Sequence, residues 1–250
     1  MASEKLTPEM LLYAYRIGIF PMAQPEDDNA LNWYAPDPRG ILPLDGFHCP
    51  QSLRRVVRQQ PFEVVSNRDF TAVMRACAVR RKPPAEYAHH PEAAAAAQGT
   101  WISEELITVY SQLHQQGFAH SVECWQHGAL VGGLYGVALG GAFFGESMFH
   151  TVTDASKVAL VYLVEQLLQA KFVLLDVQFT TQHLARFGVS EIPRREYERR
   201  LSRAVRLKRL FPTGPLSLHG HTMPLPVIPA PMPPQPATLP ADRPPETHHE

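Results

Sequence analysis

The pattern of apolar and polar residues is clearest between residues 132 and 178. Residues 134–149 contain two apolar runs of strand length, separated by Gly140 and Gly141. Residues 154–169 place leucines and a valine on one helical stripe, and residues 172–179 form another short apolar run. The pattern therefore predicts strand, strand, helix and strand in this order.

Polar residues interrupt two of these predicted strands. Asp176 and Gln178 are two residues apart in the last one, so we expect them to share a face with Phe172 and Leu174. In the strand that ends near residue 149, alternation likewise places Phe144, Glu146 and Met148 on one face. A carboxylate inside an apolar strand has two interpretations. Asp176 either meets solvent or backbone N–H groups at a strand end, or faces a cleft opposite Glu146.

The rest of the chain reads as alternating short helices and strands. Thr7 and Pro8 mark the start of the first helix, Ser52 and Ser103 are expected caps further on, and Asp154 is expected to cap the helix of the central stretch. Further helices are predicted over residues 8–18, 52–60, 70–78, 104–116, 181–187 and 193–210. Further strands are predicted over residues 62–65, 120–125 and 189–192.

This order predicts an α+β fold with a mixed sheet flanked by helices. We expect a small N-terminal α+β domain over residues 1–60 and the main domain over residues 61–210. Half of the 24 prolines lie in residues 211–250, where no periodic apolar pattern remains. That segment is therefore expected to be a disordered tail, dispensable beyond about Pro212.

Charge and cysteine content narrow the functional classes. The net charge of −1 argues against a uniformly basic nucleic-acid binder, although two segments are locally basic. One contains Arg54, Arg55 and Arg58, and the other places nine Lys and Arg against three acids in residues 186–209. These segments suit contacts to phosphate, or are simply solvated helix faces. The three cysteines lack zinc or disulfide spacing, and no run is apolar enough to span a bilayer, so we expect a soluble intracellular protein.

Nine motifs occur in one order along residues 6–210, and together they resemble the bacterial leucyl/phenylalanyl-tRNA–protein transferases. They are AYRIGIFPM, PDPRG, TWIS, FAHSVE, LVGGLYGVALG, FFGESMF, DASKVAL, LLDVQF and SEIPRREY. The resemblance implies transfer of Leu or Phe, less often Met, from aminoacyl-tRNA to the N-terminal Arg or Lys of a protein, which marks it for degradation. It also implies a GNAT-like fold with two splayed parallel strands, no metal, no coenzyme, a cytoplasmic location and a monomer.

The resemblance assigns roles to particular residues. Asp176 and Gln178 fall at the positions of the catalytic pair, and Trp101 falls near the terminal adenosine of the tRNA. Positions around the aminoacyl pocket are occupied by Glu146, Met148, Leu134, Leu160, Leu163 and Leu175. Contacts to tRNA are expected from Trp101, Met22, Arg54, Arg55, Arg58, Arg194 and Arg195.

This chain departs from the family pattern at the pocket. Met22 stands where better-known members carry Trp, so an aromatic stacking surface is either lost or replaced by Trp33 or Tyr34. Leu163 and Leu167 stand where two phenylalanines are expected. These differences affect the relative use of Leu and Phe.

The assigned chemistry is physically reasonable because the donor ester is already activated. An α-ammonium has a pKa of about 7.7–8, so a single carboxylate such as Asp176 can take its proton. Gln178 can orient Asp176, the amine or the oxyanion. An acyl-CoA-dependent N-acetyltransferase is the alternative on this fold, but the turn at residues 150–156 lacks glycine and carries Asp154. A non-catalytic RNA-binding module would leave Asp176, Gln178 and Glu146 unexplained.

Overall fold

The computed structural model describes residues 5–24, 30–79 and 100–218, and the structural statements below concern these ranges. The helices are α1 (Pro8–Arg16), α2 (Gln51–Gln59), α3 (Phe70–Cys77), α5 (Glu104–Gln115), α6 (Ala155–Gln169), α7 (Gln182–Ala185) and α8 (Arg194–Ala204). The strands are β1 (Phe20–Gln24), β2 (Ala30–Tyr34), β3 (Arg39–Ile41), β4 (Glu63–Ser66), β5 (Ala119–Gln126), β6 (Ala129–Leu139), β7 (Ala142–His150), β8 (Leu174–Gln178), β9 (Ser190–Ile192) and β10 (Gly214–Pro215).

One large mixed sheet organises the fold. Its strand order is β10-β4-β5-β6-β7-β8-β3-β9, while β1 and β2 form a separate antiparallel pair. β7 and β8 run parallel, and α6 supplies the crossover that parallel neighbours require. The prediction of an α+β fold with a mixed sheet flanked by helices is confirmed.

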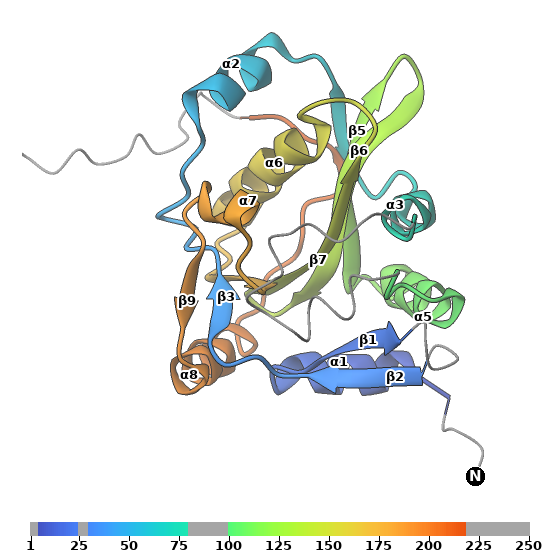
Figure 1. Cartoon of the computed structure of the whole chain (residues 1–250), viewed down its shortest axis with the longest axis vertical. Helices are drawn as coiled ribbons and strands as arrows, with labels where there is room; N and C mark the ends of the chain where they lie inside the picture. Colours follow the sequence, from blue (N-terminus) through green and yellow to red (C-terminus); the bar gives the residue numbers. More distant parts are fainter. Residues whose placement is uncertain (1–4, 25–29, 80–99, 219–250) are drawn as a thin grey trace, which may run out of the picture.

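Helices cover both faces of this sheet (Figure 1). α6 packs on β5, β6 and β7 from one side, with α2 outside it, whereas α1, α3 and α5 lie on the other side. The buried side chains accordingly form two cores. Neighbouring residues of one strand alternate between them, as Leu134 and Tyr135 do on β6.

The N-terminal segment contributes to the large sheet as well as to its own hairpin. β3 pairs with both β8 and β9, and the Leu42 N–H donates to the Leu175 carbonyl. α2 packs on α6. The domain boundary near residue 60 stays a prediction. Residues 39–59, which precede this boundary, are in direct contact with elements that precede it and with elements that follow it.

Two of the four expected helix caps are confirmed. The side chains of Thr7 and Ser103 each accept a hydrogen bond from the backbone N–H three residues ahead. The prediction that Ser52 caps α2 is wrong, because the helix begins directly after Pro50 and Ser52 lies inside it. Asp154 precedes α6 with a left-handed φ of 67°, and its carboxylate binds Lys157 at 2.7 Å in place of the helix backbone.

The expected disorder of the tail is wrong for residues 211–218. β10 pairs antiparallel with β4 at the edge of the sheet, where proline is tolerated because no ladder N–H is lost. The Ser66 hydroxyl donates to the Pro212 carbonyl at 3.0 Å. Phe211 is buried, and its ring stacks on His120 with centroids 4.5 Å apart. Residues 219–250, the rest of the predicted tail, lie outside the described residues.

Phe211 should therefore contribute measurably to stability. We expect Phe211→Ala to lower the free energy of unfolding by about 3 kcal/mol, because a buried aromatic ring is replaced by a cavity. Urea unfolding would measure this. The matched control is Leu210→Ala, since Leu210 is 89% exposed and should change stability by less than about 0.5 kcal/mol. Equal effects of the two variants would contradict the packing role of the segment.

Candidate active site

A pocket of about 590 Å³ lies where β7 and β8 separate. The two strands pair only from Ala142 to Phe144, opposite Leu174 to Asp176, although β7 continues to His150. Beyond this point they diverge, and side chains of β6, β7, β8, α6 and α7 line the gap. The expected opening between the strands ending near His150 and Gln178 is therefore observed.

Nine of the residues predicted for the site line this pocket. They are Met22, Trp101, Leu134, Glu146, Met148, Leu160, Leu163, Leu175 and Gln178. Asp176 does not line it, and neither do the predicted tRNA-binding arginines of α2 and α8. Trp33 and Tyr34, the suggested replacements for a missing aromatic, are not lining residues either.

A β-bulge decides where Glu146 points. Tyr135 pairs with Ser147 and Gly136 pairs with Gly145, so Glu146 is an extra residue without a partner on β6. The bulge reverses the alternation beyond it. Phe144 and Met148 therefore face different cores, and the expectation that they share a face is wrong.

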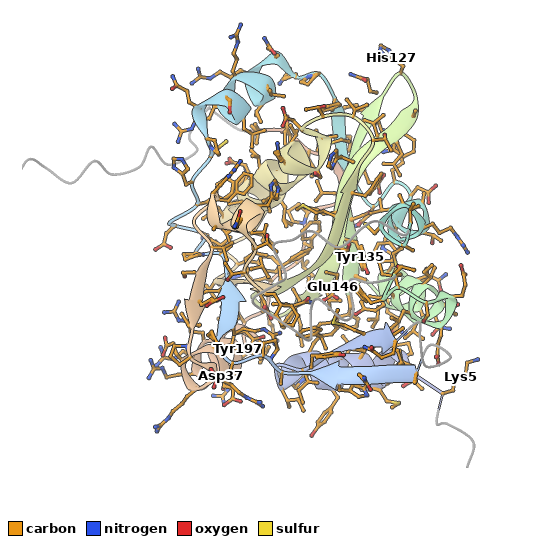
Figure 2. The ribbon with its side chains drawn as sticks, in the orientation of Figure 1. Lys5, Asp37, His127, Tyr135, Glu146 and Tyr197 are labelled. Carbon is orange, nitrogen blue, oxygen red and sulfur yellow. The ribbon has the colours of Figure 1, made fainter. Side chains whose placement is uncertain are left out.

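The Glu146 carboxylate sits among hydroxyl and amide donors from three other elements. Its Oε1 accepts a hydrogen bond from the Tyr15 hydroxyl of α1 at 2.7 Å and from Nε2 of Gln178 at 2.9 Å. Because Tyr15 gives its one proton to Oε1, the Tyr110 hydroxyl of α5 donates to the Tyr15 oxygen, and its own oxygen lies 3.4 Å from Oε2. Tyr135 and Glu146 lie close together near the centre of the molecule (Figure 2).

Burial raises the pKa of Glu146 to about 7, and the hydrogen bonds from Tyr15 and Gln178 oppose the shift only in part. The side chain is half-buried because it reaches into the pocket while protein surrounds the carboxylate. A carboxyl group with this pKa exchanges its proton near neutral pH. Glu146 is therefore able to hold or release a proton under ordinary conditions.

This pKa predicts how Glu146 affects stability. Because the folded pKa lies above the ordinary 4.5, the contribution of Glu146 is full below about pH 4.5 and is lost as pH rises through about 7. Glu146→Gln stays neutral and avoids this loss. We expect the variant to match wild type near pH 4.5 and to be more stable by about 1–3 kcal/mol at about pH 8. Urea unfolding at both pH values measures the difference, and a gap that does not grow with pH would refute it.

Asp176 is completely buried in a network of its own. It accepts hydrogen bonds from Nε and Nη2 of Arg39 at 3.0 and 2.7 Å, and from the Tyr197 hydroxyl at 2.6 Å. The backbone N–H of Gln178 donates to its Oδ1 at 2.8 Å. Arg39 is itself only 1% exposed. Of the two interpretations drawn from sequence, this geometry matches a carboxylate held by protein donors, one of them a backbone N–H.

The Arg39 guanidinium is surrounded by aromatic rings and a hydrogen-bond acceptor as well as by Asp176. It lies over the rings of Phe20 and Tyr197, 4.8 and 4.6 Å from their centroids, and donates to the Gly18 carbonyl. Burial alone would lower the pKa of Arg39, but the Asp176 carboxylate raises it above its usual value, so the guanidinium stays charged.

Gln178 connects the buried network to the pocket. Its φ of 64° is left-handed, a conformation that is strained for a residue with a side chain. In this conformation its N–H reaches Asp176 while its side-chain amide reaches Glu146. Asp176 thus determines the position of Gln178, and Gln178 contacts the pocket.

Sequence reasoning missed several residues of this site. They come from five different elements and are Arg39, Tyr15, Tyr110, Tyr135 and Tyr197. All of them except Tyr110 lie in quoted motifs, namely PDPRG, AYRIGIFPM, LVGGLYGVALG and SEIPRREY, which was the available signal. Within the described residues, no group of three or more potential metal ligands occurs. None of the helices described here is both long and apolar enough for a membrane span.

Together these features give an apolar pocket beside side chains that can hold or exchange a proton, an arrangement typical of an enzyme active site. Comparison with known proteins agrees. A family model for the leucyl/phenylalanyl-tRNA protein transferases matches residues 41–202, and the model of their N-terminal domain matches residues 4–37. The chain belongs to this family and is an aminoacyltransferase.

Individual relatives carry the same name, leucyl/phenylalanyl-tRNA–protein transferase. The Salinibacter ruber protein is 51% identical over 202 residues, covering 81% of each chain. The Paramagnetospirillum magneticum protein is 52% identical, covering 80% of this chain and 90% of its own. The Herpetosiphon aurantiacus protein is 49% identical, covering 84% and 100%.

A solved structure of L-PGS from Bacillus licheniformis aligns with a TM-score of 0.35 and 13% identity over 77% of this chain. This chain spans 62% of that protein. Such a distant likeness carries no argument about fold or function.

Proposed function

We propose that this protein transfers Leu or Phe, less often Met, from aminoacyl-tRNA to the N-terminal Arg or Lys of proteins and so marks them for degradation through the N-end rule. The observation that carries this proposal is the pocket, whose apolar wall ends at Glu146 and Gln178. Its volume of about 590 Å³ suits an apolar side chain joined to an adenosine. We further propose that the enzyme is cytoplasmic, because its donor substrate is made in the cytoplasm, and that it needs no cofactor, because this donor is already activated. We also propose that it is a monomer.

The pocket divides naturally into two parts. Side chains from β6, β7, β8 and α6 form an apolar wall for the aminoacyl group, namely Leu134, Met148, Leu160, Leu163 and Leu175. Trp101 and Met22 lie together at another part of the lining, where the Ala23 N–H donates to the Trp101 carbonyl. We assign these two residues to the terminal adenosine, with Trp101 providing the stacking surface and Met22 a polarizable side chain beside it.

Asp176 and Gln178 act as one catalytic unit in this proposal. Gln178 touches the substrate from the pocket wall, and Asp176 holds Gln178 from behind. A GNAT-like architecture is proposed as well, and the separation of the parallel strands β7 and β8 supports it.

The proposal is tested by offering the purified protein two kinds of donor with a peptide that begins with Arg. Transfer from Leu-tRNA or Phe-tRNA is expected, and transfer from acetyl-CoA is not. Modification by acetyl-CoA alone would favour the N-acetyltransferase alternative. RNA binding with neither reaction would favour a non-catalytic module.

Donor preference should depend on Leu163. Leu163 lines the pocket, whereas Leu167, one helical turn further along α6, is buried in the core outside it. We expect Leu163→Phe to narrow the pocket and to shift the ratio of kcat/KM for Phe over Leu toward Leu by about 10-fold. Leu167→Phe is the matched control, which should lower stability by about 1–3 kcal/mol through overpacking without changing the ratio. An unchanged ratio in Leu163→Phe would remove Leu163 from the aminoacyl subsite.

A further inference from the structure

We propose that Glu146, rather than Asp176, takes the proton from the attacking α-ammonium of the acceptor. This inference rests on the proposed function and adds a catalytic residue to it. Among the described residues that line the pocket, the carboxylates are Glu146 and Asp154. Asp154 is paired with Lys157 at 2.7 Å, and Asp176 has no exposed surface.

The two oxygens of Glu146 are unequally occupied. Oε1 accepts two short hydrogen bonds, from Tyr15 and Gln178, which fix the carboxylate. Among the described residues, the one polar contact of Oε2 is the Tyr110 hydroxyl at 3.4 Å, so the acceptor capacity of Oε2 is largely unused. An ammonium group entering the pocket would therefore find Oε2 as its hydrogen-bond acceptor.

A second observation marks the same place. The Tyr135 hydroxyl is fully buried and has no hydrogen-bond partner among the described residues, yet Tyr135 lines the pocket next to Glu146. Buried hydroxyl groups are normally satisfied. The polar groups at this end of the pocket are therefore incompletely satisfied by the described residues, and a polar substrate group there would give Oε2 a partner.

The other ionisable groups around Glu146 are less suited than Glu146 to accept the proton of the α-ammonium. Burial raises the pKa of the Tyr15, Tyr110 and Tyr135 hydroxyls, so these groups on α1, α5 and β6 stay neutral. On β8, β3 and α8 the charge of Asp176 is matched by Arg39 and hydrogen-bonded by Tyr197. The pKa of Glu146, about 7, is close to the value of about 7.7–8 of an α-ammonium.

The reaction balances with Glu146 as the base. The acceptor α-ammonium gives one proton to Oε2, and the resulting amine attacks the ester carbonyl of the donor. The C–N bond forms, the C–O bond to the ribose breaks, and the second amine proton moves to the departing ribose oxygen. The products are an amide and a free ribose hydroxyl, and Glu146 then releases its proton to solvent.

The test compares Glu146→Gln with wild type in the full chain, using Phe-tRNA and two acceptors. One acceptor is an Arg-peptide, and the other is its aminooxy analogue, whose terminal nitrogen is unprotonated at neutral pH. We expect Glu146→Gln to slow single-turnover transfer to the Arg-peptide by about 10²–10⁴-fold and to recover most of the rate with the aminooxy acceptor. The acid limb of the pH–rate profile should lose the step that belongs to Glu146.

Controls separate this inference from other causes. Glu165→Gln changes a buried glutamate of α6 that hydrogen-bonds Gln169 and lies outside the pocket lining, so it should transfer normally. Binding of a non-hydrolysable phenylalanyl adenosine should weaken far less in Glu146→Gln than transfer slows. Equal losses with both acceptors, or an unaltered pH profile, would overturn the assignment of the base. Absence of transfer in wild type would instead refute the proposed function.

Discussion

Replacing Asp176 with Asn is expected to cost about 3–5 kcal/mol of unfolding free energy and to lower kcat by at least about 100-fold. The loss of stability follows from Arg39, whose buried guanidinium would keep its charge without a carboxylate partner. The loss of rate follows from Gln178, whose left-handed backbone is bonded to Asp176. Misplacement of a catalytic side chain by about 1 Å can cost about 100-fold in rate.

A double variant separates these two effects. Arg39→Met with Asp176→Leu removes the ion pair and fills the space with apolar atoms, a change that is often neutral or stabilising. We expect urea unfolding to show recovery of most of the stability lost in Asp176→Asn, while kcat stays low and the affinity for tRNA stays near wild type. Recovery of both stability and kcat would show that Asp176 serves folding only. A fully active Asp176→Asn variant would remove it from the catalytic unit.

Affinity for tRNA should fall steeply with salt, because the acceptor stem presents phosphates. The predicted contacts lie on α2 and α8, at opposite ends of the molecule with α6, α7 and β3 between them (Figure 1). The arginines of these two helices are not equally free to bind phosphate. Arg194 and Arg199 form ion pairs with Glu198 and Glu196, and Arg54 donates to the Cys49 carbonyl. Within the described residues, Arg55, Arg58 and Arg195 are exposed and have no ion pair.

Arg55→Ala with Arg58→Ala should therefore flatten the log–log dependence of affinity on salt by about two units, roughly one for each phosphate contact. An aminoacylated adenosine should show little salt dependence with either protein. The control is Arg68→Ala with Arg75→Ala, which removes the same charge around α3, on the other face of the sheet. If both double variants change the slope equally, net charge rather than α2 explains the binding. An unchanged slope in the α2 variant would remove α2 from the tRNA contact.

Local sequence was sufficient for most of the secondary structure. The strand–strand–helix–strand order of the central stretch follows from its periodicity, and Thr7 and Ser103 cap their helices because capping needs only neighbouring residues. Motif order also identified the family, as well as nine of the residues that line the pocket. These are properties of short segments, which a linear reading can capture.

Long-range contacts decided the rest. The edge strand formed by residues 214 and 215 depends on β4, about 150 positions earlier, so proline content alone was misleading there. The bulge at Glu146 depends on its register with β6, which strand alternation does not reveal.

The chemistry of the two carboxylates was likewise decided by tertiary structure. Arg39 and Asp176 are 137 positions apart, and their pairing closes off a carboxylate that looked accessible. Burial gives Glu146 its near-neutral pKa, against the opposing hydrogen bonds from Tyr15 and Gln178. Sequence determined which groups the site contains, but only the fold decided which of them meets the substrate, because solvation and hydrogen bonding depend on distant partners.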